Sequence, residues 1–489
     1  MSIINEIKRI KESTQKAYES AENKGATTIP EIKNIDNLSV CIDSIQGGGS
    51  EPTPPEHEED TRFKEVIEGT VVNLEDSTTT KIKDYCFYKD SVLTTINMSK
   101  VESIGDYAFQ SATALTSVSF PFLKTIGKYG FANCSKLSSE IVSDSITTIK
   151  ANAFQGTPIT KLHLKNLTNI PNYMAFECRH LTSVDMPNVI TVDDESNFCK
   201  CYALSSVSLP KLQRIAMRMF QACALTEATF ESATYLARGC FFDCSKLETI
   251  NLPNVTEMGQ DAFSGGCSSL KNVNMPKLHT ISSSNGFNSC IALEEISLPE
   301  LTKINGASTF ARCKKLKSIN FPKLTDYSGD STFRYCSALE TVTLPAIKVV
   351  GNRMFEDCTS LSSASFPTCT RIYGAAFQDD VSLVSVDAPE TTIIDGWAFY
   401  NTQVIKLKFP KLVNINGDKA FMNCKNLSAL LLANDKVCTL ANSNAFTGTP
   451  IASGTGYIYV NDDLVDTYKS ATNWTVYKNQ IKPISEYVE

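Results

Sequence analysis

The sequence lacks a basic excess, a long apolar run and an apolar leader. Its 46 Lys and Arg are outnumbered by 53 Asp and Glu, which gives a formal net charge of −7. A phosphate-binding surface normally carries a basic excess, so a nucleic-acid partner is not expected. No stretch approaches the roughly 18 consecutive apolar residues of a membrane-spanning helix, and residues 1–10 do not form a secretory leader. We therefore expect neither membrane insertion nor export by the ordinary signal-peptide route.

Catalytic and metal-binding motifs are also missing. The sequence holds four His and contains no Gly-x-Ser-x-Gly, Walker, His-Glu-x-x-His or dinucleotide-binding motif. His163 is expected on a strand as a surface residue. The acidic run Asp193 to Glu195 lacks the spacing of a calcium loop, and Cys199 and Cys201 are not the Cys-x-x-Cys pair of a zinc site. We expect no catalytic residue, no cofactor and no metal site, and thus a protein that is not an enzyme.

Phenylalanine marks an internal repeat. Successive members of the series lie 21 to 25 residues apart, and mostly 22. This period is in the range of leucine-rich repeats and predicts about seventeen stacked units. The series is Phe87, Phe109, Phe131, Phe154, Phe176, Phe198, Phe220, Phe241, Phe263, Phe287, Phe310, Phe333, Phe355, Phe377, Phe399, Phe421 and Phe446.

One regular unit shows what each repeat contains. Residues 293–299 read Leu-Glu-Glu-Ile-Ser-Leu-Pro, which is the alternation of a short strand. Pro299 ends this strand because proline cannot donate the next ladder hydrogen bond. Residues 307–313, Ala-Ser-Thr-Phe-Ala-Arg-Cys, are expected to form a short helical turn on the outer side, before Leu316 opens the next strand. A single unit buries too few apolar side chains to fold alone, so neighbouring units must stack.

The cysteines follow the same period. Eleven of the 17 lie two to four residues after a phenylalanine of the series. A cysteine at a fixed position of each repeat is expected to be a small buried hydrophobic residue, so we expect free thiols in the core. The eleven are Cys134, Cys178, Cys201, Cys223, Cys244, Cys267, Cys290, Cys313, Cys336, Cys358 and Cys424.

The unit Leu-x-x-Val-x-Leu-Pro…Ile…Ala-Phe-x-x-Cys-x-x-Leu resembles the BspA-like leucine-rich repeat family over residues 65–455. The resemblance implies an α/β repeat solenoid over residues 61–456, with a parallel sheet on one face. It also implies recognition or adhesion rather than catalysis. Some units depart from the pattern: the one at Leu137 lacks Leu-Pro, and those at Phe154, Phe399 and Phe446 have no cysteine.

The two ends differ from the repeats. Residues 1–46 are predicted to be a helical module for attachment or oligomerisation, and residues 47–60 are a linker of Gly, Pro and acidic residues. Residues 457–489 are predicted to cap the solenoid, whose open end would otherwise expose apolar edges. The first helix carries a heptad seam of Ile3, Ile7, Ile10, Thr14, Ala17 and Ala21. Self-association, for example as a homotrimer, and packing on the chain's own domain or on a partner both remain open.

The residues that flank the central Val or Ile of each strand should point outward. Their small hydroxyl and amide side chains form a candidate recognition strip, although Ser, Thr and Asn also suit a tight parallel ladder in which they bond to one another. The loops and the C-terminal tip are alternative contact sites. The strip consists of Ser183, Asp185, Ser206, Ser208, Thr249, Asn251, Asn272, Asn274, Glu295, Ser297, Ser318 and Asn320, and the same pattern recurs at Ser117/Ser119, Thr341/Thr343 and Ser363/Ser365.

Both ends of the chain carry a second resemblance. Residues 458–474 are similar to the C-terminal ends of such proteins in gut bacteria and their prophages, and residues 29–45 resemble the start of phage tail proteins. This implies a phage tail fibre or receptor-binding protein of the virion, made in the bacterial cytoplasm. Its N-terminal module would contact tail components, and its solenoid would bind a protein or glycan receptor on a bacterial surface. The alternative is a BspA-like adhesin on a bacterial cell surface that binds host proteins.

Overall fold

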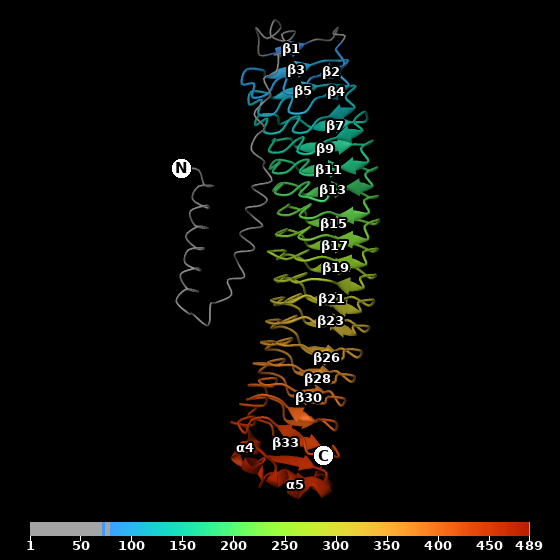
Figure 1. Cartoon of the computed structure of the whole chain (residues 1–489). Helices are drawn as coiled ribbons and strands as arrows, with labels where there is room; N and C mark the ends of the chain where they lie inside the picture. The colour runs from blue at the N-terminus through green and yellow to red at the C-terminus, as the bar shows by residue number, and fades with distance from the viewer. Residues whose placement is uncertain (1–70, 74–78, 489) are drawn as a thin grey trace, which may run out of the picture. The chain divides into compact units, whose positions relative to one another are not determined.

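The computed structural model describes residues 71–73 and 79–488. The chain divides into a unit of residues 1–59 and a unit of residues 60–489, and the described residues belong to the second. The predicted N-terminal helical module, its heptad seam from Ile3 to Ala21, and the linker 47–60 lie outside the described residues. The second unit is a long stack of coils, shown in Figure 1.

Each regular coil contains one longer strand and one two-residue strand, and each paired strand lies parallel to its equivalent in the next coil. The longer strands are β1 (Val71–Asn73), β3 (Thr95–Asn97), β5 (Ser117–Ser119), β7 (Ile141–Ser143), β9 (Lys161–Leu164), β11 (Ser183–Asp185), β13 (Ser206–Ser208), β15 (Glu227–Thr229), β17 (Thr249–Asn251), β19 (Asn272–Asn274), β21 (Glu295–Ser297), β23 (Ser318–Asn320), β25 (Thr341–Thr343), β27 (Ser363–Ser365), β29 (Ser385–Asp387), β31 (Lys406–Lys408), β33 (Ala429–Leu432), β35 (Tyr457–Val460) and, in the C-terminal segment, β36 (Ile481–Pro483). We call the outward side of these strands the strand face.

The two-residue strands form a second ladder. They are β2 (Lys81–Ile82), β4 (Ser103–Ile104), β6 (Thr125–Ile126), β8 (Thr148–Ile149), β10 (Asn169–Ile170), β12 (Thr191–Val192), β14 (Arg214–Ile215), β16 (Tyr235–Leu236), β18 (Glu257–Met258), β20 (Thr280–Ile281), β22 (Lys303–Ile304), β24 (Asp326–Tyr327), β26 (Val349–Val350), β28 (Arg371–Ile372), β30 (Ile393–Ile394), β32 (Asn414–Ile415) and β34 (Thr439–Leu440). The fold is therefore a parallel β-solenoid with two ladders, where the sequence predicted a single sheet.

The third side of each coil is formed by turns, and the predicted helical turn is wrong. In the coil of Phe310, both Ser308 (φ 55°) and Arg312 (φ 63°) are left-handed, which interrupts a right-handed helix. The backbone N–H groups instead donate to the next coil, Ser308 to Asp330 and Phe310 to Thr332, both at 2.8 Å. Hydrogen bonds to the next coil thus alternate with single-turn bonds inside the coil, such as Ala311 N–H to Ser308 and Cys313 N–H to Phe310, and no continuous helix forms.

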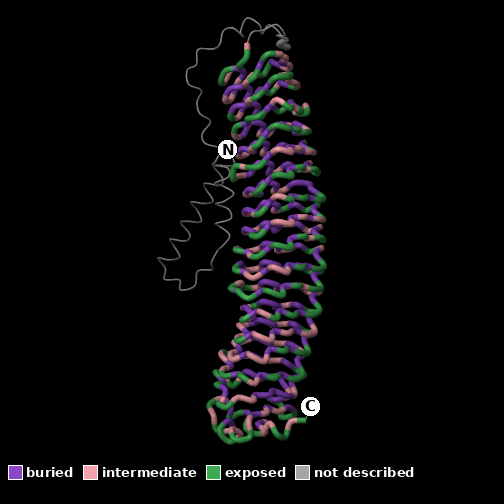
Figure 2. The backbone as a smooth tube through the Cα atoms, turned by 90° about the vertical axis from the view of Figure 1, so that its right-hand side faces the viewer, coloured by how far each residue is buried: buried purple, intermediate pink, exposed green. Residues whose placement is uncertain are grey.

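A column of stacked rings runs through the core. Phe310 lies between Phe287 and Phe333, with ring centroids 5.1 and 5.4 Å away and the rings nearly parallel. Cys313 is fully buried, and its Sγ donates to the Phe287 carbonyl of the preceding coil at 3.2 Å. The other ten cysteines of the series are also free and buried, which confirms the prediction of core thiols. Figure 2 shows the buried positions recurring from coil to coil.

The phenylalanine series slips at one coil. The N–H of Phe154 donates to Met174, and the N–H of Ala175 donates to Asn197. Ala175, not Phe176, therefore occupies the core position, and it is fully buried. Phe176 is half-buried, with the Lys200 ammonium 5.2 Å from its ring centroid. Assigning Phe176 to the stack was thus wrong by one residue.

Other side chains fill the cysteine position in the coils that lack one. Thr157, Thr402 and Thr449 are buried there, and each hydroxyl donates to the carbonyl of the phenylalanine in its own coil. Cysteine and threonine at this position both offer a short side chain with one donor, whereas the coil of Phe109 places Ala112 there. In the coil of Phe377 the position holds Asp380, which is fully buried.

The C-terminal segment covers the last coil. It contains the α-helices α4 (Pro450–Ser453) and α5 (Val465–Ser470) and the 3-10 helices η1 (Asp462–Leu464), η2 (Thr475–Tyr477) and η3 (Ile484–Glu486). Trp474 is fully buried 6.1 Å from the ring of Phe446, and its indole N–H donates to the Cys438 carbonyl at 2.7 Å. The Tyr468 hydroxyl accepts the Cys438 N–H at 2.8 Å. These contacts shield apolar side chains that a further coil would otherwise cover.

Candidate recognition surface

The strand face results from the alternation along each longer strand. In β21 the side chain of Ile296 is 3% exposed and points into the core, whereas Glu295 and Ser297 are exposed. Because β21 and β23 pair in register, Glu295 lies beside Ser318 and Ser297 beside Asn320. Two outward rows of side chains thus follow the axis of the solenoid.

All twelve residues of the predicted strip lie on these rows. They come from β11, β13, β17, β19, β21 and β23, and each is exposed or half-buried. The strip is not one unbroken sheet, since β13, β19 and β23 each end a hydrogen-bonded sheet. His163, which was predicted to be a surface residue on a strand, also lies on this face. Its Nε2 is 2.6 Å from the carboxylate of Asp185. The ligand-binding role of the strip stays a prediction.

Part of the strip bonds to itself. The Asn274 amide donates to the Asn251 carbonyl oxygen at 2.6 Å. Equivalent bonds join Asn272 to Thr249 at 3.1 Å and Asn320 to Ser297 at 2.9 Å. These amides stabilise the ladder, as the alternative interpretation expected. In contrast, the side chains of Ser206 and Ser208 form no hydrogen bond or ion pair among the described residues, and both are exposed.

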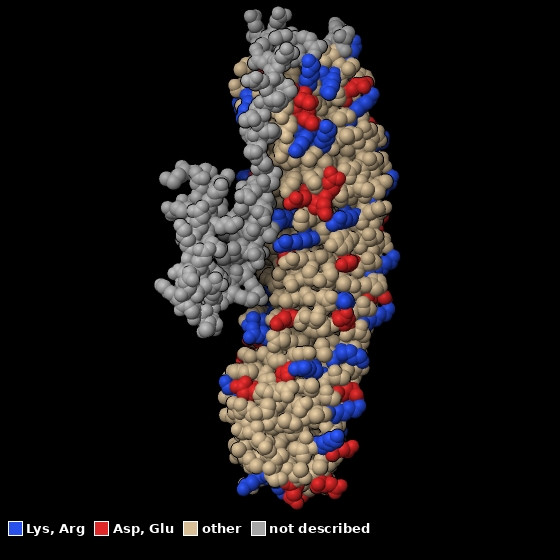
Figure 3. Space-filling view, in the orientation of Figure 1, with Lys and Arg blue, Asp and Glu red and all other residues tan. Residues whose placement is uncertain are grey.

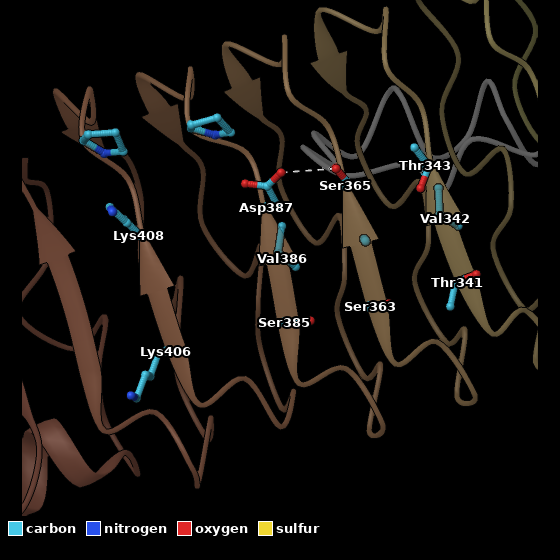
Figure 4. Close-up of a pocket in the computed structure, with 13 residues that line it drawn as sticks. Thr341, Val342, Thr343, Ser363, Ser365, Ser385, Val386, Asp387, Lys406 and Lys408 are labelled. Carbon is cyan, nitrogen blue, oxygen red and sulfur yellow. Dashed lines mark hydrogen bonds between the residues drawn. The ribbon is translucent and has the colours of Figure 1, made fainter. Parts of the chain in front are cut away.

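A hollow of about 490 Å³ opens farther along the same face, across β25, β27, β29 and β31. Figure 4 shows its two rows of side chains. One row consists of Thr341, Ser363, Ser385 and Lys406, and the other of Thr343, Ser365, Asp387 and Lys408. The inward residues between the rows are Val342, Ala364, Val386 and Leu407, each at most 8% exposed. The lining available to a ligand therefore combines hydroxyl and charged groups with apolar surface, to which Pro389 and Pro410 also contribute.

The charged end of this hollow was not predicted from the sequence. Ser385 and Asp387 flank Val386 as other outward pairs flank their central residues, and Lys406 and Lys408 flank Leu407. The sequence does carry a signal for these residues, since they repeat the three-residue pattern of the other outward pairs. Only pairs of small polar residues were assigned to the predicted strip. Only the structure shows that these four side chains and the hydroxyls of β25 and β27 border one hollow.

Charge on the solenoid is largely paired between coils. Lys317 lies 3.0 Å from Glu294, Lys323 lies 2.7 Å from Glu300, and other pairs follow the same spacing. The Lys317 ammonium lowers the pKa of the Glu294 carboxyl through a hydrogen bond and its charge. In the face that Figure 3 shows, the two signs are interspersed and form no single charged field.

The lysines of the hollow differ from this scheme. Among the described residues no carboxylate forms an ion pair with Lys406 or Lys408, although both are exposed. Asp387 instead accepts a hydrogen bond from the Ser365 hydroxyl at 3.2 Å. The ammonium of Lys406 lies 5.6 Å from the ring centroid of Tyr487. The hollow thus presents two cations that have no carboxylate partner among the described residues.

Two buried carboxylates lie apart from this surface. Burial raises the pKa of Asp380 well above its ordinary value, and its Oδ2 has no hydrogen-bond partner. Burial also raises the pKa of Glu356, against the opposing effect of the Arg334 guanidinium, whose Nη2 lies 2.8 Å from the carboxylate. Both groups are enclosed by neighbouring coils and offer no access to a substrate.

Clustered metal ligands and membrane-spanning helices are two further features on which the described residues bear. Within residues 71–73 and 79–488, no group of three or more His, Cys, Asp or Glu side chains is placed to hold a metal ion. None of the helices described is both long enough and apolar enough to cross a membrane. The expectation that the chain is not an enzyme stays a prediction.

Parallel ladders with a period of about 22 residues, filled by Leu, Ile and Phe, define a leucine-rich-repeat solenoid. This chain belongs to the BspA-type family of these proteins. The family model, a BspA type leucine rich repeat region of 6 copies, matches residues 59–178, 168–290, 234–362 and 348–461. Family membership indicates a role in recognition or adhesion. No curated protein matches the sequence.

Solved structures share the fold. A leucine-rich repeat protein from Bacteroides ovatus ATCC 8483 is 22% identical, with 80% of this chain and 92% of that chain covered and a TM-score of 0.53. A leucine rich cell surface protein from Faecalibacterium prausnitzii A2-165 is 21% identical, with 65% and 86% covered and a TM-score of 0.35. The match to the Bacteroides ovatus protein supports the repeat architecture. The predicted resemblance to phage tail proteins gains no support from the family model or from this structure.

Proposed function

We propose that this chain is a recognition protein of a bacterial cell surface, an adhesin that binds a host protein through its strand face. Membership of the BspA-type family supports this proposal. The observation that carries the proposal is the strand face itself, where buried or half-buried apolar central residues hold two rows of outward polar side chains on a regular ladder. Such a face is preorganised, so a partner binds it with little loss of conformational entropy.

The strand face also has the chemistry of a surface that contacts a large partner. Its outward residues change along the axis, from Asp185 through Glu295 to Lys408, while the residues beneath them stay apolar. A macromolecule that spans several coils would meet a distinct sequence of donors, acceptors and charges. The binding specificity then arises from the outward rows of side chains, and the stability of the fold arises from the inward residues.

Location is tested first, with an antibody against residues 61–489. We expect the chain in the washed envelope of the producing bacterium, where added protease removes it from intact cells. A band in purified phage particles, at fixed stoichiometry to a capsid protein, would contradict the surface location. It would favour the tail-protein prediction, which rests on residues 1–46 and on the resemblance of both ends.

Binding is tested with a matched pair of variants. Ser208→Arg places a large cation on the strand face, and Ser245→Arg makes the same change at an exposed turn after Cys244. If the strand face contacts host protein, Ser208→Arg reduces adhesion of the purified chain to host cells while Ser245→Arg leaves it unchanged. If both variants adhere equally well, the strand face around Ser208 is not the contact site, and the turns or the C-terminal segment would be.

A further inference from the structure

The lining of the hollow across β25, β27, β29 and β31 matches a polyhydroxylated ligand. Its floor presents the hydroxyls of Thr341, Thr343, Ser363, Ser365 and Ser385. Each hydroxyl both donates and accepts hydrogen bonds, as sugar hydroxyls do. The carboxylate of Asp387 adds an acceptor beside them. The volume of about 490 Å³ falls in the range of roughly 300 to 1,000 Å³ that small-ligand sites occupy.

The two lysines give the hollow a preference for an anion. On the same face, Lys161 is 2.7 Å from Glu140 and is therefore neutralised within the solenoid. Lys406 and Lys408 form no such ion pair with the described carboxylates, and both line the hollow. A carboxylate or sulfate of a ligand would gain charge-assisted hydrogen bonds there without displacing a partner.

Aromatic rings lie beyond the lysines, past β33, whose outward residues Ala429 and Leu431 are buried. Tyr457 and Tyr459 lie on β35, two coils after β31, and both are half-buried. The Tyr459 and Tyr487 rings meet edge to face at 5.0 Å, and Lys406 approaches Tyr487. An aromatic ring combines an apolar face with a polar hydroxyl, which suits the C–H face of a sugar ring.

We propose that this hollow binds an acidic carbohydrate, a sugar chain that carries carboxylate or sulfate groups. The inference rests on the proposed recognition role and adds the ligand chemistry: the host protein would be bound through its acidic sugars. The hydroxyl rows position the sugar, and Lys406 and Lys408 bind its anionic groups beside the half-buried ring of Tyr487.

An acidic protein segment fits the hollow less well. Protein partners anchor themselves by placing apolar or aromatic side chains in pockets. Of the apolar residues that line the hollow, Val342, Ala364 and Val386 are 2%, 4% and 8% exposed, and Pro389 and Pro410 are half-buried, so a large side chain finds little apolar surface to bury. A sugar needs no apolar anchor of this kind, because its hydroxyls meet the rows of Ser and Thr.

Calorimetric titration of the full chain tests the proposal with defined oligosaccharides. The probes are a hyaluronan hexasaccharide, which carries carboxylates, and a heparin hexasaccharide, which also carries sulfates. Neutral chitohexaose and a hexaglutamate peptide are the controls for charge and for sugar. We expect at least one acidic hexasaccharide to bind at least about tenfold more tightly than either control, with an affinity that falls as salt is added.

Variants connect this binding to the hollow. Lys406→Gln combined with Lys408→Gln should weaken the binding about tenfold or more. The matched control is Lys323→Gln combined with Lys411→Gln, which removes two lysines that pair with Glu300 and Glu390. Ser385→Leu fills the hollow without a change of charge and should also abolish binding. Unchanged urea midpoints would verify that these variants fold.

Three results would overturn the inference: no binding of either acidic hexasaccharide, binding that the lysine substitutions leave unchanged, or equally tight binding of hexaglutamate. The last would assign the lysines to an acidic protein segment. A failure of the carbohydrate proposal can be distinguished from a failure of the proposed adhesin function. Adhesion to host cells that free hexasaccharide does not inhibit would retain the adhesin and reject the sugar site, whereas sugar binding without adhesion would do the reverse.

Discussion

Replacing Asp380 with threonine is expected to stabilise the solenoid. Asp380 occupies the position that Cys358 occupies in the preceding coil and Thr402 in the following one, and it is fully buried. Its Oδ1 accepts the Cys358 N–H at 2.7 Å, whereas Oδ2 has no partner. The Cys358 N–H also donates to the Phe355 carbonyl at 2.9 Å, so it keeps an acceptor after the substitution.

The magnitude follows from these contacts. A buried polar atom without a hydrogen bond costs about 1 to 3 kcal/mol, and a neutral hydrogen bond contributes about 0.5 to 1.5 kcal/mol. Threonine removes the unpartnered oxygen, and its hydroxyl is expected to donate to the carbonyl of Phe377, as Thr402 donates to Phe399. We expect Asp380→Thr to raise the free energy of unfolding by about 1 to 2 kcal/mol at neutral pH.

The gain should depend on pH in a defined direction. Burial raises the pKa of Asp380 in the folded chain, so the folded state retains a proton that the unfolded state releases. The free energy of unfolding of the unsubstituted chain therefore falls as pH rises above the unfolded value, near 4. The advantage of Asp380→Thr should be small below pH 4 and should grow toward pH 8.

Urea unfolding followed by circular dichroism at pH 4, 6 and 8 measures this difference, and hydrogen exchange over residues 355–380 locates it. Asp435→Thr, at an exposed position, makes the same change of charge and serves as the control. A variant that is less stable than the unsubstituted chain at pH 8, or an advantage that shrinks with rising pH, would refute the reasoning.

Three further predictions concern the core. Phe154→Ala should cost about 3 to 5 kcal/mol, because this ring is fully buried, and Phe176→Ala should cost clearly less, because Phe176 is half-buried; equal urea midpoints would contradict the assigned register. Burial raises the pKa of Cys313 to about 12, so iodoacetamide at pH 8 should modify this thiol only after denaturation, as mass spectrometry would show. Gly306→Ala should lower the thermal midpoint, because the added Cβ would overlap the backbone oxygen of Ser283 in the preceding coil.

Much of the repeat architecture was predictable because each coil repeats the same burial. The period of Phe310 and its equivalents, the strand before Pro299 and the buried thiol of Cys313 were all read from spacing. The second ladder was not, since a two-residue strand such as β22 (Lys303–Ile304) has too few residues to show an alternation. The turns that replaced the predicted helix depend on hydrogen bonds to the next coil.

The sequence by itself determined which side chains face outward on each longer strand, because side chains alternate along a strand. It placed the twelve strip residues on one face, although not their role. Only the tertiary structure decided which of these side chains bond to one another, as Asn274 does with Asn251. It also decided that Lys408 lacks a carboxylate partner among the described residues, that Ala175 rather than Phe176 enters the core, and that Asp380 is enclosed. Each of these outcomes depends on contacts between residues about 22 positions apart, which a reading of one unit does not contain.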